Sequence, residues 1–159
     1  MRWLFWFLLV PQPFLLLGWL GQSGWPSVDF GAVLCLFLLL FAEPVLLPAL
    51  LLGAAVGRAL IDEASIPVQI LVLGIPIAVL LPLRSWFYRN QIWWQVLASA
   101  LFAVAIPKLA GLCGTWFGQP SASAALDWWR VFWTALMGPV LLWPLRQIPP
   151  FRSFVERGR

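Results

Sequence analysis

The amino-acid sequence predicts an all-α fold: a polytopic helical integral membrane protein with about six transmembrane helices in one bundle, or five in an alternative interpretation. Composition is the first reason, because 62% of the 159 residues are hydrophobic and only 10% are charged, with a mean hydropathy of +0.91. Soluble domains carry about 25% charged residues. The charge pattern is the second reason, because most basic residues lie beside apolar stretches rather than within them. Lipid must therefore cover much of the surface.

A helix that crosses a bilayer needs about 20 apolar residues. Stretches near this length recur along the chain, which we interpret as a single transmembrane domain over residues 1–159. The predicted spans cover residues 3–20, 28–42, 45–61, 66–83, 92–116 and 128–145, and a basic tail follows over residues 146–159. Pro11 and Pro13 interrupt the first stretch and no A-x-A cleavage site follows it, so we interpret it as an uncleaved span.

Residues 30–60 decide the number of spans. This stretch is too long for one comfortable helix and short for two, and Glu43 and Pro44 stand at its middle. Proline lacks a backbone donor and a carboxylate is poorly tolerated in lipid, so we expect a very tight turn there. One tilted helix over the same residues would instead give five spans.

Basic residues predict the side of the membrane on which each loop lies. Arginine and lysine beside short spans stay on the cytoplasmic side, because their translocation is unfavourable. Six spans then place both termini, the loop at 84–90 and the tail in the cytoplasm. The expected membrane-surface anchors, which would bind anionic lipid headgroups, are Arg84, Arg89, Arg146, Arg152 and Arg157. They form no basic face, so we do not expect nucleic acid as a partner.

Ala49, Gly53 and Gly57 recur at four-residue spacing, which places them on one face of a helix. Small residues at this spacing let two helix backbones approach closely, and van der Waals packing then drives their association in lipid. We expect this helix-packing face to contact either another helix of the same bundle or a helix of a partner protein.

Four charged residues in or near the spans form a candidate polar cluster: Arg58, Asp62, Glu63 and Lys108. Arg58 and Asp62 are four residues apart and can pair on one helix face, although Arg58 can also snorkel to the interface without a partner. Lys108 lies about 12 Å along its helix from Trp116, a depth at which its charge needs compensation. We expect an internal pair with Asp62 or Glu63, with an ion or ligand site as the alternative.

Residue patterns typical of several enzyme classes are missing from the sequence. It has no histidine, no G-x-S-x-G segment and no phosphate-binding G-x-x-x-x-G-K loop. Its aspartates stand at span ends and do not cluster for a metal ion. Cys35 and Cys113 lie in apolar runs, where thiols behave as small hydrophobes. We expect a protein that is not an enzyme and has no cofactor or metal site.

Two segments carry a likeness to a known family. The first is a Gly-rich span that ends in an acidic residue, then a short polar turn and a span closed by basic residues: Gly53, Gly57, Ile61, Asp62, Ser65 and Pro67, followed by Arg84 and Arg89. The second is the last span with its basic end: Thr134, Ala135, Leu136, Leu142, Trp143, Pro144, Leu145 and Arg146. In these segments, and in length and span layout, the chain resembles the MreD family of bacterial rod shape-determining membrane proteins.

This resemblance implies a non-enzymatic scaffold in the bacterial inner membrane, within the cell-shape and side-wall peptidoglycan-synthesis machinery. The implied partners are a bitopic MreC-like protein, MreB, and peptidoglycan synthesis proteins of the RodA-like and class B penicillin-binding types. MreD-like proteins are also similar in layout to the six-span substrate-binding components of vitamin transporters. The alternative is therefore a small-molecule-binding, S-component-like transporter subunit, which needs a pocket with convergent polar groups.

The charge pattern predicts the accessibility of two loops. Cysteine substituted for Ser123 should react with a membrane-impermeant thiol reagent in intact spheroplasts, because the loop after the fifth span lies outside. Cysteine substituted for Ser153 should react only after permeabilisation, because the basic tail lies inside. A mass-tag shift on a gel measures both. Labelling at position 153 but not at position 123 in intact spheroplasts would contradict this topology.

Overall fold

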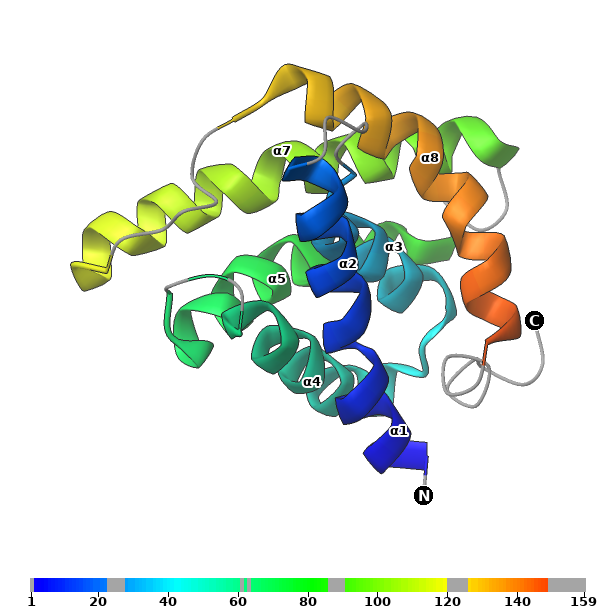
Figure 1. Cartoon of the computed structure of the whole chain (residues 1–159). Coiled ribbons are helices and arrows are strands. Elements are labelled where there is room, and N and C mark those ends of the chain that lie inside the picture. The colour runs from blue at the N-terminus through cyan, green and yellow to red at the C-terminus, as the bar shows by residue number, and fades with distance from the viewer. Residues whose placement is uncertain are drawn as a thin grey trace.

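The structure, a computed structural model, describes residues 2–22, 28–60, 62, 64–85, 91–119 and 126–148. Its helices are α1 (Arg2–Leu9), α2 (Pro11–Gln22), α3 (Phe30–Phe41), α4 (Leu47–Ala59), α5 (Ile66–Leu80), α7 (Gln91–Phe117) and α8 (Trp128–Gln147). Short 3₁₀ turns, η1 (Pro44–Leu46) and η2 (Leu81–Leu83), precede α4 and follow α5. The described residues form no strand, so the predicted all-α class is confirmed (Figure 1).

Helix α3 is the centre of this arrangement. All of its residues are buried, and it contacts α2, α4, α5, α7 and α8. In Figure 1 it lies behind α2, near the middle of the molecule. A helix that is apolar on every side is typical of a buried core helix or a membrane span. Here the surrounding helices cover it completely.

The length of α3 differs from the expectation for residues 28–42. Its 12 residues extend about 18 Å at 1.5 Å per residue, whereas the hydrocarbon core of a bilayer is about 30 Å thick. The stretch expected as the second span is therefore a shorter helix inside the bundle. Both of its ends must find partners within the protein.

The helix is interrupted at Pro44, where the sequence predicted a turn. Helix α3 ends at Phe41 and α4 begins at Leu47. Glu43 is extended, with φ −62° and ψ 131°, as the residue before a proline prefers. Residues 30–60 are thus two helices that contact each other, with the turn at Glu43 and Pro44, and not one long tilted helix.

A second break divides the stretch at residues 3–20, which was expected to be a single span. Helix α1 ends at Leu9 and α2 begins at Pro11. Proline clashes with the preceding helical turn and has no N–H to donate, but its fixed φ suits the first position of a new helix. The Val10 N–H still donates to the Trp6 carbonyl at 3.0 Å, so the interruption is short.

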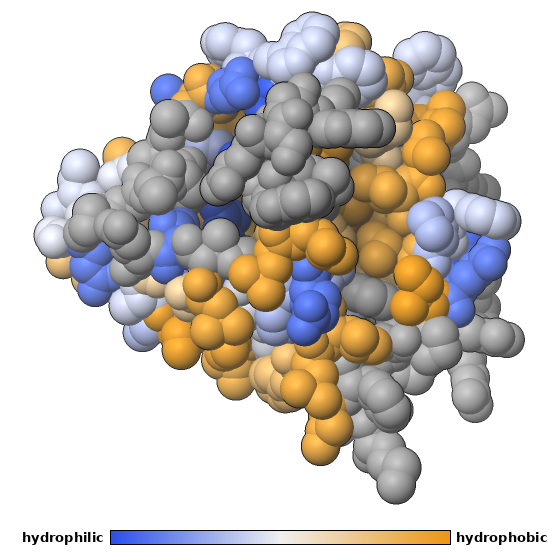
Figure 2. Space-filling model, viewed as in Figure 1, coloured by the Kyte–Doolittle hydropathy of each residue, from blue (hydrophilic) through white to orange (hydrophobic). Residues whose placement is uncertain are grey.

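Among the residues that the structure describes, two helical stretches are long and apolar enough to cross a bilayer, by length and composition alone: Ile66–Leu83 and Ile92–Phe117. Shorter apolar helices cover Trp6–Leu16, Phe30–Phe41 and Pro44–Ala59. Hydrophobic side chains spread over much of the described surface in Figure 2, above all in its lower part. Soluble monomers rarely expose apolar patches larger than a few hundred Å².

Gly53 and Gly57 bring α4 close to α1 and α2. A Cβ at Gly53 would lie 2.4 Å from Trp6 Nε1, and a Cβ at Gly57 would lie 3.4 Å from the Pro11 backbone. Trp6 Nε1 also donates a hydrogen bond to the Leu50 carbonyl at 3.3 Å. These two glycines of the small-residue face therefore pack within the chain.

Ala49, the third residue of that face, does not take part in this packing. It is exposed, whereas the next residue, Leu50, is completely buried. Adjacent helical residues differ by about 100° around the axis. At this turn of α4, Leu50 therefore points into the bundle and Ala49 does not. Gly53 and Gly57 thus pack against α1 and α2 of the same chain, whereas Ala49 is exposed.

Helices α7 and α8 use a similar close contact. A Cβ at Gly138 would lie 2.8 Å from Ser99 Cβ. The Ser99 hydroxyl is 2.9 Å from the Val96 carbonyl of its own helix and 3.1 Å from the Ala135 carbonyl of α8. A small residue and a short hydroxyl thus let the two helices approach and bond.

The glycine contacts predict different tolerance to the same substitution. Gly53→Ala should destabilise the protein by about 1–3 kcal/mol, because the added methyl group overlaps the Trp6 indole and forces it away from Leu50. Gly57→Ala is the matched control and should be neutral or stabilising by up to about 1 kcal/mol, since it meets only ordinary contacts and alanine favours helix. Thermal unfolding in detergent, followed by tryptophan fluorescence, measures both. Equal effects would contradict the close contact.

Candidate functional site

Asp29 joins the start of α3 to α8. Its side chain caps the helix by accepting from the Ala32 N–H at 3.3 Å. The Asp29 N–H donates to the Thr134 hydroxyl at 2.8 Å, and its carboxylate lies 3.5 Å from the Arg130 guanidinium. Asp29 and Thr134 are buried, and the Arg130 side chain is 41% exposed. One carboxylate therefore caps a helix and pairs with a cation from another.

Arg58, Asp62 and Gln69 form a second buried group beside the first. Arg58 Nε lies 4.0 Å from Asp62 Oδ2, and the Gln69 side-chain amide donates to the same oxygen at 3.0 Å. All three residues are buried. Arg58 stands in the last turn of α4 and Gln69 in the first turns of α5, so these bonds close the connection between the two helices.

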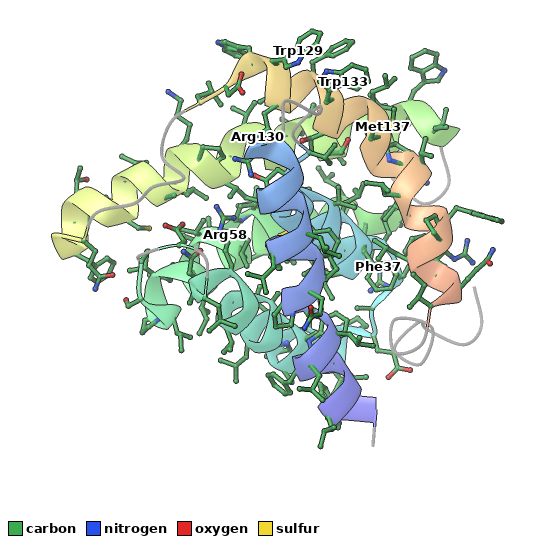
Figure 3. All side chains as sticks on the ribbon, viewed as in Figure 1. Phe37, Arg58, Trp129, Arg130, Trp133 and Met137 are labelled. Carbon is green, nitrogen blue, oxygen red and sulfur yellow. The ribbon has the colours of Figure 1, made fainter. Side chains whose placement is uncertain are left out.

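The two groups meet at Gly31 in the first turn of α3. A Cβ placed there would lie 3.0 Å from both Arg58 Nη1 and Asp29 Oδ1, so these opposite charges are within about 6 Å of each other, a range in which buried charges interact strongly. Figure 3 shows Arg130 from α8 and Arg58 from α4 converging on this region. The set Asp29, Arg58, Asp62, Gln69, Arg130 and Thr134 is called the polar layer below.

Charges of opposite sign alternate through the polar layer, in the order Arg130, Asp29, Arg58 and Asp62. Burying a charge is costly unless it is paired and hydrogen-bonded. Two cations and two anions in alternation leave the layer without net charge. The layer joins α3, α4, α5 and α8 at one end of the bundle.

Arginines occupy the opposite end of α3. Arg84 is buried and donates from Nη2 to the Leu40 carbonyl at 3.2 Å. The Arg146 guanidinium carbon lies 4.7 Å from the centre of the Phe41 ring, within cation–π range. A carboxylate at the positive start of α3 and cations at its negative end both interact favourably with the helix dipole. We call Arg84 and Arg146 the basic end.

The structure includes part of the predicted polar cluster. Arg58 and Asp62 pair as expected from their spacing. Glu63 and the anchors Arg89, Arg152 and Arg157 lie outside the described residues. The anchors Arg84 and Arg146 contact the end of α3 as described above.

Lys108 does not form the expected ion pair with Asp62, and the other expected partner, Glu63, lies outside the described residues. Lys108 is exposed on α7, whereas Ile106 and Ala110 on either side of it are buried. Residues two positions apart on a helix point in nearly opposite directions. At this turn of α7, Ile106 and Ala110 face the bundle, so Lys108 faces away from it.

Sequence reasoning missed four members of the polar layer: Asp29, Gln69, Arg130 and Thr134. Asp29 had a local signal, because an aspartate just before an apolar run is a typical helix N-cap. Arg130 and Thr134 had none, since they reach Asp29 only through the fold, and Thr134 is 105 positions away. Gln69 is uncharged, so no charge pattern in the sequence indicates its role.

The polar layer has the chemistry of a structural network. Its carboxylates are engaged by arginine, amide and backbone groups, and among the described residues no three His, Cys, Asp or Glu side chains are grouped to hold a metal ion. Comparison with protein-family models, curated proteins and solved structures finds no match to this chain. The function of this chain must therefore be inferred from the arrangement of its own residues.

The polar layer predicts a strong effect of removing one charge. Asp29→Asn keeps the cap, because asparagine caps helices as well as aspartate, but it leaves Arg130 and Arg58 without their shared carboxylate. Breaking a buried pair costs about 3–5 kcal/mol, and the partial exposure of Arg130 reduces this to about 2 kcal/mol. The thermal unfolding midpoint in detergent should fall by several degrees.

Asp127 provides the matched control. It caps α8 by accepting from the Trp129 N–H at 2.9 Å, but it is exposed. Asp127→Asn should therefore change the midpoint little. Adding Arg130→Gln to Asp29→Asn should recover part of the loss, which a double-mutant cycle measures. Similar midpoints for the Asp29 and Asp127 variants would show that the charges of the polar layer contribute nothing.

Proposed function

We propose that this chain is a multi-pass protein of the bacterial inner membrane and a non-enzymatic scaffold of the side-wall peptidoglycan-synthesis machinery. It binds a bitopic MreC-like partner in an assembly with MreB, a RodA-like protein and a class B penicillin-binding protein. The observation that carries the proposal is the distribution of polarity: ion pairs bind the helices to one another inside, and large apolar faces point outward. A scaffold in lipid requires both properties.

Exposed tryptophans support the membrane position. Trp93 and Trp116 stand near the two ends of α7 and are 75% and 78% exposed, and Trp128 and Trp143 stand near the two ends of α8 and are each 69% exposed. Tryptophan prefers the membrane–water interface, where its ring is amphipathic. Trp93 and Trp116 are about 35 Å apart along α7, enough to bracket a hydrocarbon core about 30 Å thick.

The direction of the helices supports a six-span arrangement. The polar layer joins the start of α3, the end of α4 and the starts of α5 and α8, whereas the basic end joins the end of α3 to η2 and the end of α8. Successive helices α3, α4 and α5 thus alternate in direction. With the positive-inside rule, the basic end faces the cytoplasm and the polar layer lies toward the outer side.

The contacts of Arg58 and Asp62 favour the scaffold over the transporter subunit. A substrate-binding component needs polar groups that converge on a ligand pocket. Here Asp62 pairs with Arg58 and accepts a hydrogen bond from Gln69, and Lys108 points outward. The polar residues that suggested a ligand site are therefore divided between internal pairs and the outer surface.

Depletion of the chain in its source bacterium, together with affinity purification from the native membrane, tests the proposal. Depleted cells should lose their rod shape, because side-wall synthesis loses its scaffold, and mass spectrometry should identify an MreC-like bitopic protein in the purified complex. Membranes with the untagged chain are the control. Recovery of a transporter ATPase, with ligand-dependent thermal stabilisation of the chain, would establish the transporter subunit instead.

A further inference from the structure

The outward side of α7 is an apolar stripe with one cation near its outer-side end. Leu97, Leu101, Lys108 and Leu112 are exposed, and their spacing of four, seven and four residues places them on one helix face. Ala105 is half-buried beside Lys108, one turn earlier. The opposite side of α7 packs against α3, α5 and α8. These five residues are called the α7 outer face.

Lys108 has no ion-pair partner among the acidic side chains that the structure describes. Asp29 and Asp62 belong to the polar layer, Asp127 is a helix cap, and Glu43 lies in the turn between α3 and α4. Within the described residues, no carboxylate therefore neutralises this cation. In water such a lysine would need no explanation.

In a bilayer the position of Lys108 has a clear cost. It lies eight residues, or about 12 Å, from Trp116 and 15 residues, or about 22 Å, from Trp93 along α7. The lysine stem extends about 6 Å, so the ammonium cannot reach the level of Trp116 by snorkelling alone. A charge left within the span costs about 2.5–3.5 kcal/mol on insertion scales.

The outer face of α8 shows what a lipid-facing surface of this chain looks like. Five of its exposed residues form an uncharged stripe: Trp129, Phe132, Leu136, Val140 and Trp143. The exposed Arg146 stands beyond this stripe, in the last turn of the helix. Trp129 and Phe132 stack with centroids 5.9 Å apart. Figure 3 places Trp129 on the outer edge of the molecule. The α7 outer face differs from this stripe by its cation and by the small residue beside it.

We infer that the α7 outer face docks a single transmembrane helix of a different protein, which places an aspartate or glutamate carboxylate against Lys108. The carboxylate neutralises the cation within the membrane, and Ala105 lets the two backbones approach at this level. The leucines above and below pack against the apolar residues of the incoming helix. The inference rests on the proposed function, because it requires α7 to lie in a bilayer.

Photocrosslinking in native membranes tests the docking. The photoreactive amino acid p-benzoylphenylalanine is placed at Leu101 or Leu112 on α7 and, as the control, at Val140 on α8. The α7 positions should yield an adduct whose crosslinked peptide is a membrane-spanning segment with a carboxylate, and the α8 position should yield lipid adducts. Lys108→Met should reduce the protein adduct by about tenfold or more, while Lys108→Arg should retain it.

Charge reversal then identifies the pair. Lys108→Glu should abolish the adduct, and exchange of the crosslinked carboxylate for lysine in the partner should restore it. Thermal unfolding of the Lys108 variants in detergent should match the unaltered protein, because the side chain is exposed, so loss of the adduct reports docking and not folding. Lys108→Gln replaces Lys108→Met where the latter lowers the unfolding midpoint.

Four results would overturn the inference: lipid adducts alone at the α7 positions, a protein adduct that Lys108→Met leaves unchanged, a second copy of this chain as the partner, or a crosslinked segment without a carboxylate. Cell shape separates this inference from the proposed function. If depletion makes the rod-shaped cells round and the Lys108→Met variant restores their shape, the docking is refuted but the scaffold role is not. A carboxylate-bearing partner helix in cells that keep their shape on depletion would refute the scaffold role alone.

Discussion

Complete burial of α3 is the constraint on which the other contacts depend. A helix leaves four N–H groups at its start and four carbonyls at its end without partners, and no solvent reaches those groups when the helix lies inside a bundle. Asp29 bonds the Ala32 N–H at the start, and Arg84 bonds the Leu40 carbonyl at the end. Thr134 and Arg84 lie 105 and 44 positions from their partners. The central helix is therefore completed only when α8 and the end of α5 have packed around it.

The shortness of α3 explains why the polar layer is neutral. At about 18 Å, the helix is shorter than the hydrocarbon core of a bilayer by roughly 12 Å, so in a membrane at least one of its polar ends lies at hydrocarbon depth. Unpaired charges there would be costly. Alternation of Arg130, Asp29, Arg58 and Asp62 removes the net charge. The orientation of the dipole adds to the same effect, because the carboxylate lies at the positive end of α3 and the arginines lie at its negative end.

The sequence predicted most helices but not their orientation, for a physical reason. Hydropathy located the stretches at 66–83 and 92–116, and proline chemistry located the turn at Glu43 and Pro44, because both signals are local. The facing of Lys108 was not predictable, since α7 is apolar toward the core and toward its surroundings alike, and a helix with two apolar sides has no periodic pattern to interpret. The ion pair between Asp29 and Arg130 was not predictable from the sequence either, because only the packing of α3 against α8 brings these residues together.

In lipid, apolar area does not select one helix packing over another, because tails and leucines are equally apolar. Selection must come from contacts that few arrangements satisfy, such as Gly53 beneath the Trp6 indole, Gly138 against Ser99, and the polar layer. Lys108 takes no part in any of these contacts, and no described carboxylate pairs with it. Within the proposed membrane setting, the cost of that charge persists in the isolated protein and is removed when a carboxylate arrives. The folded chain alone is then less favourable than its complex, which is the thermodynamic property that a scaffold needs.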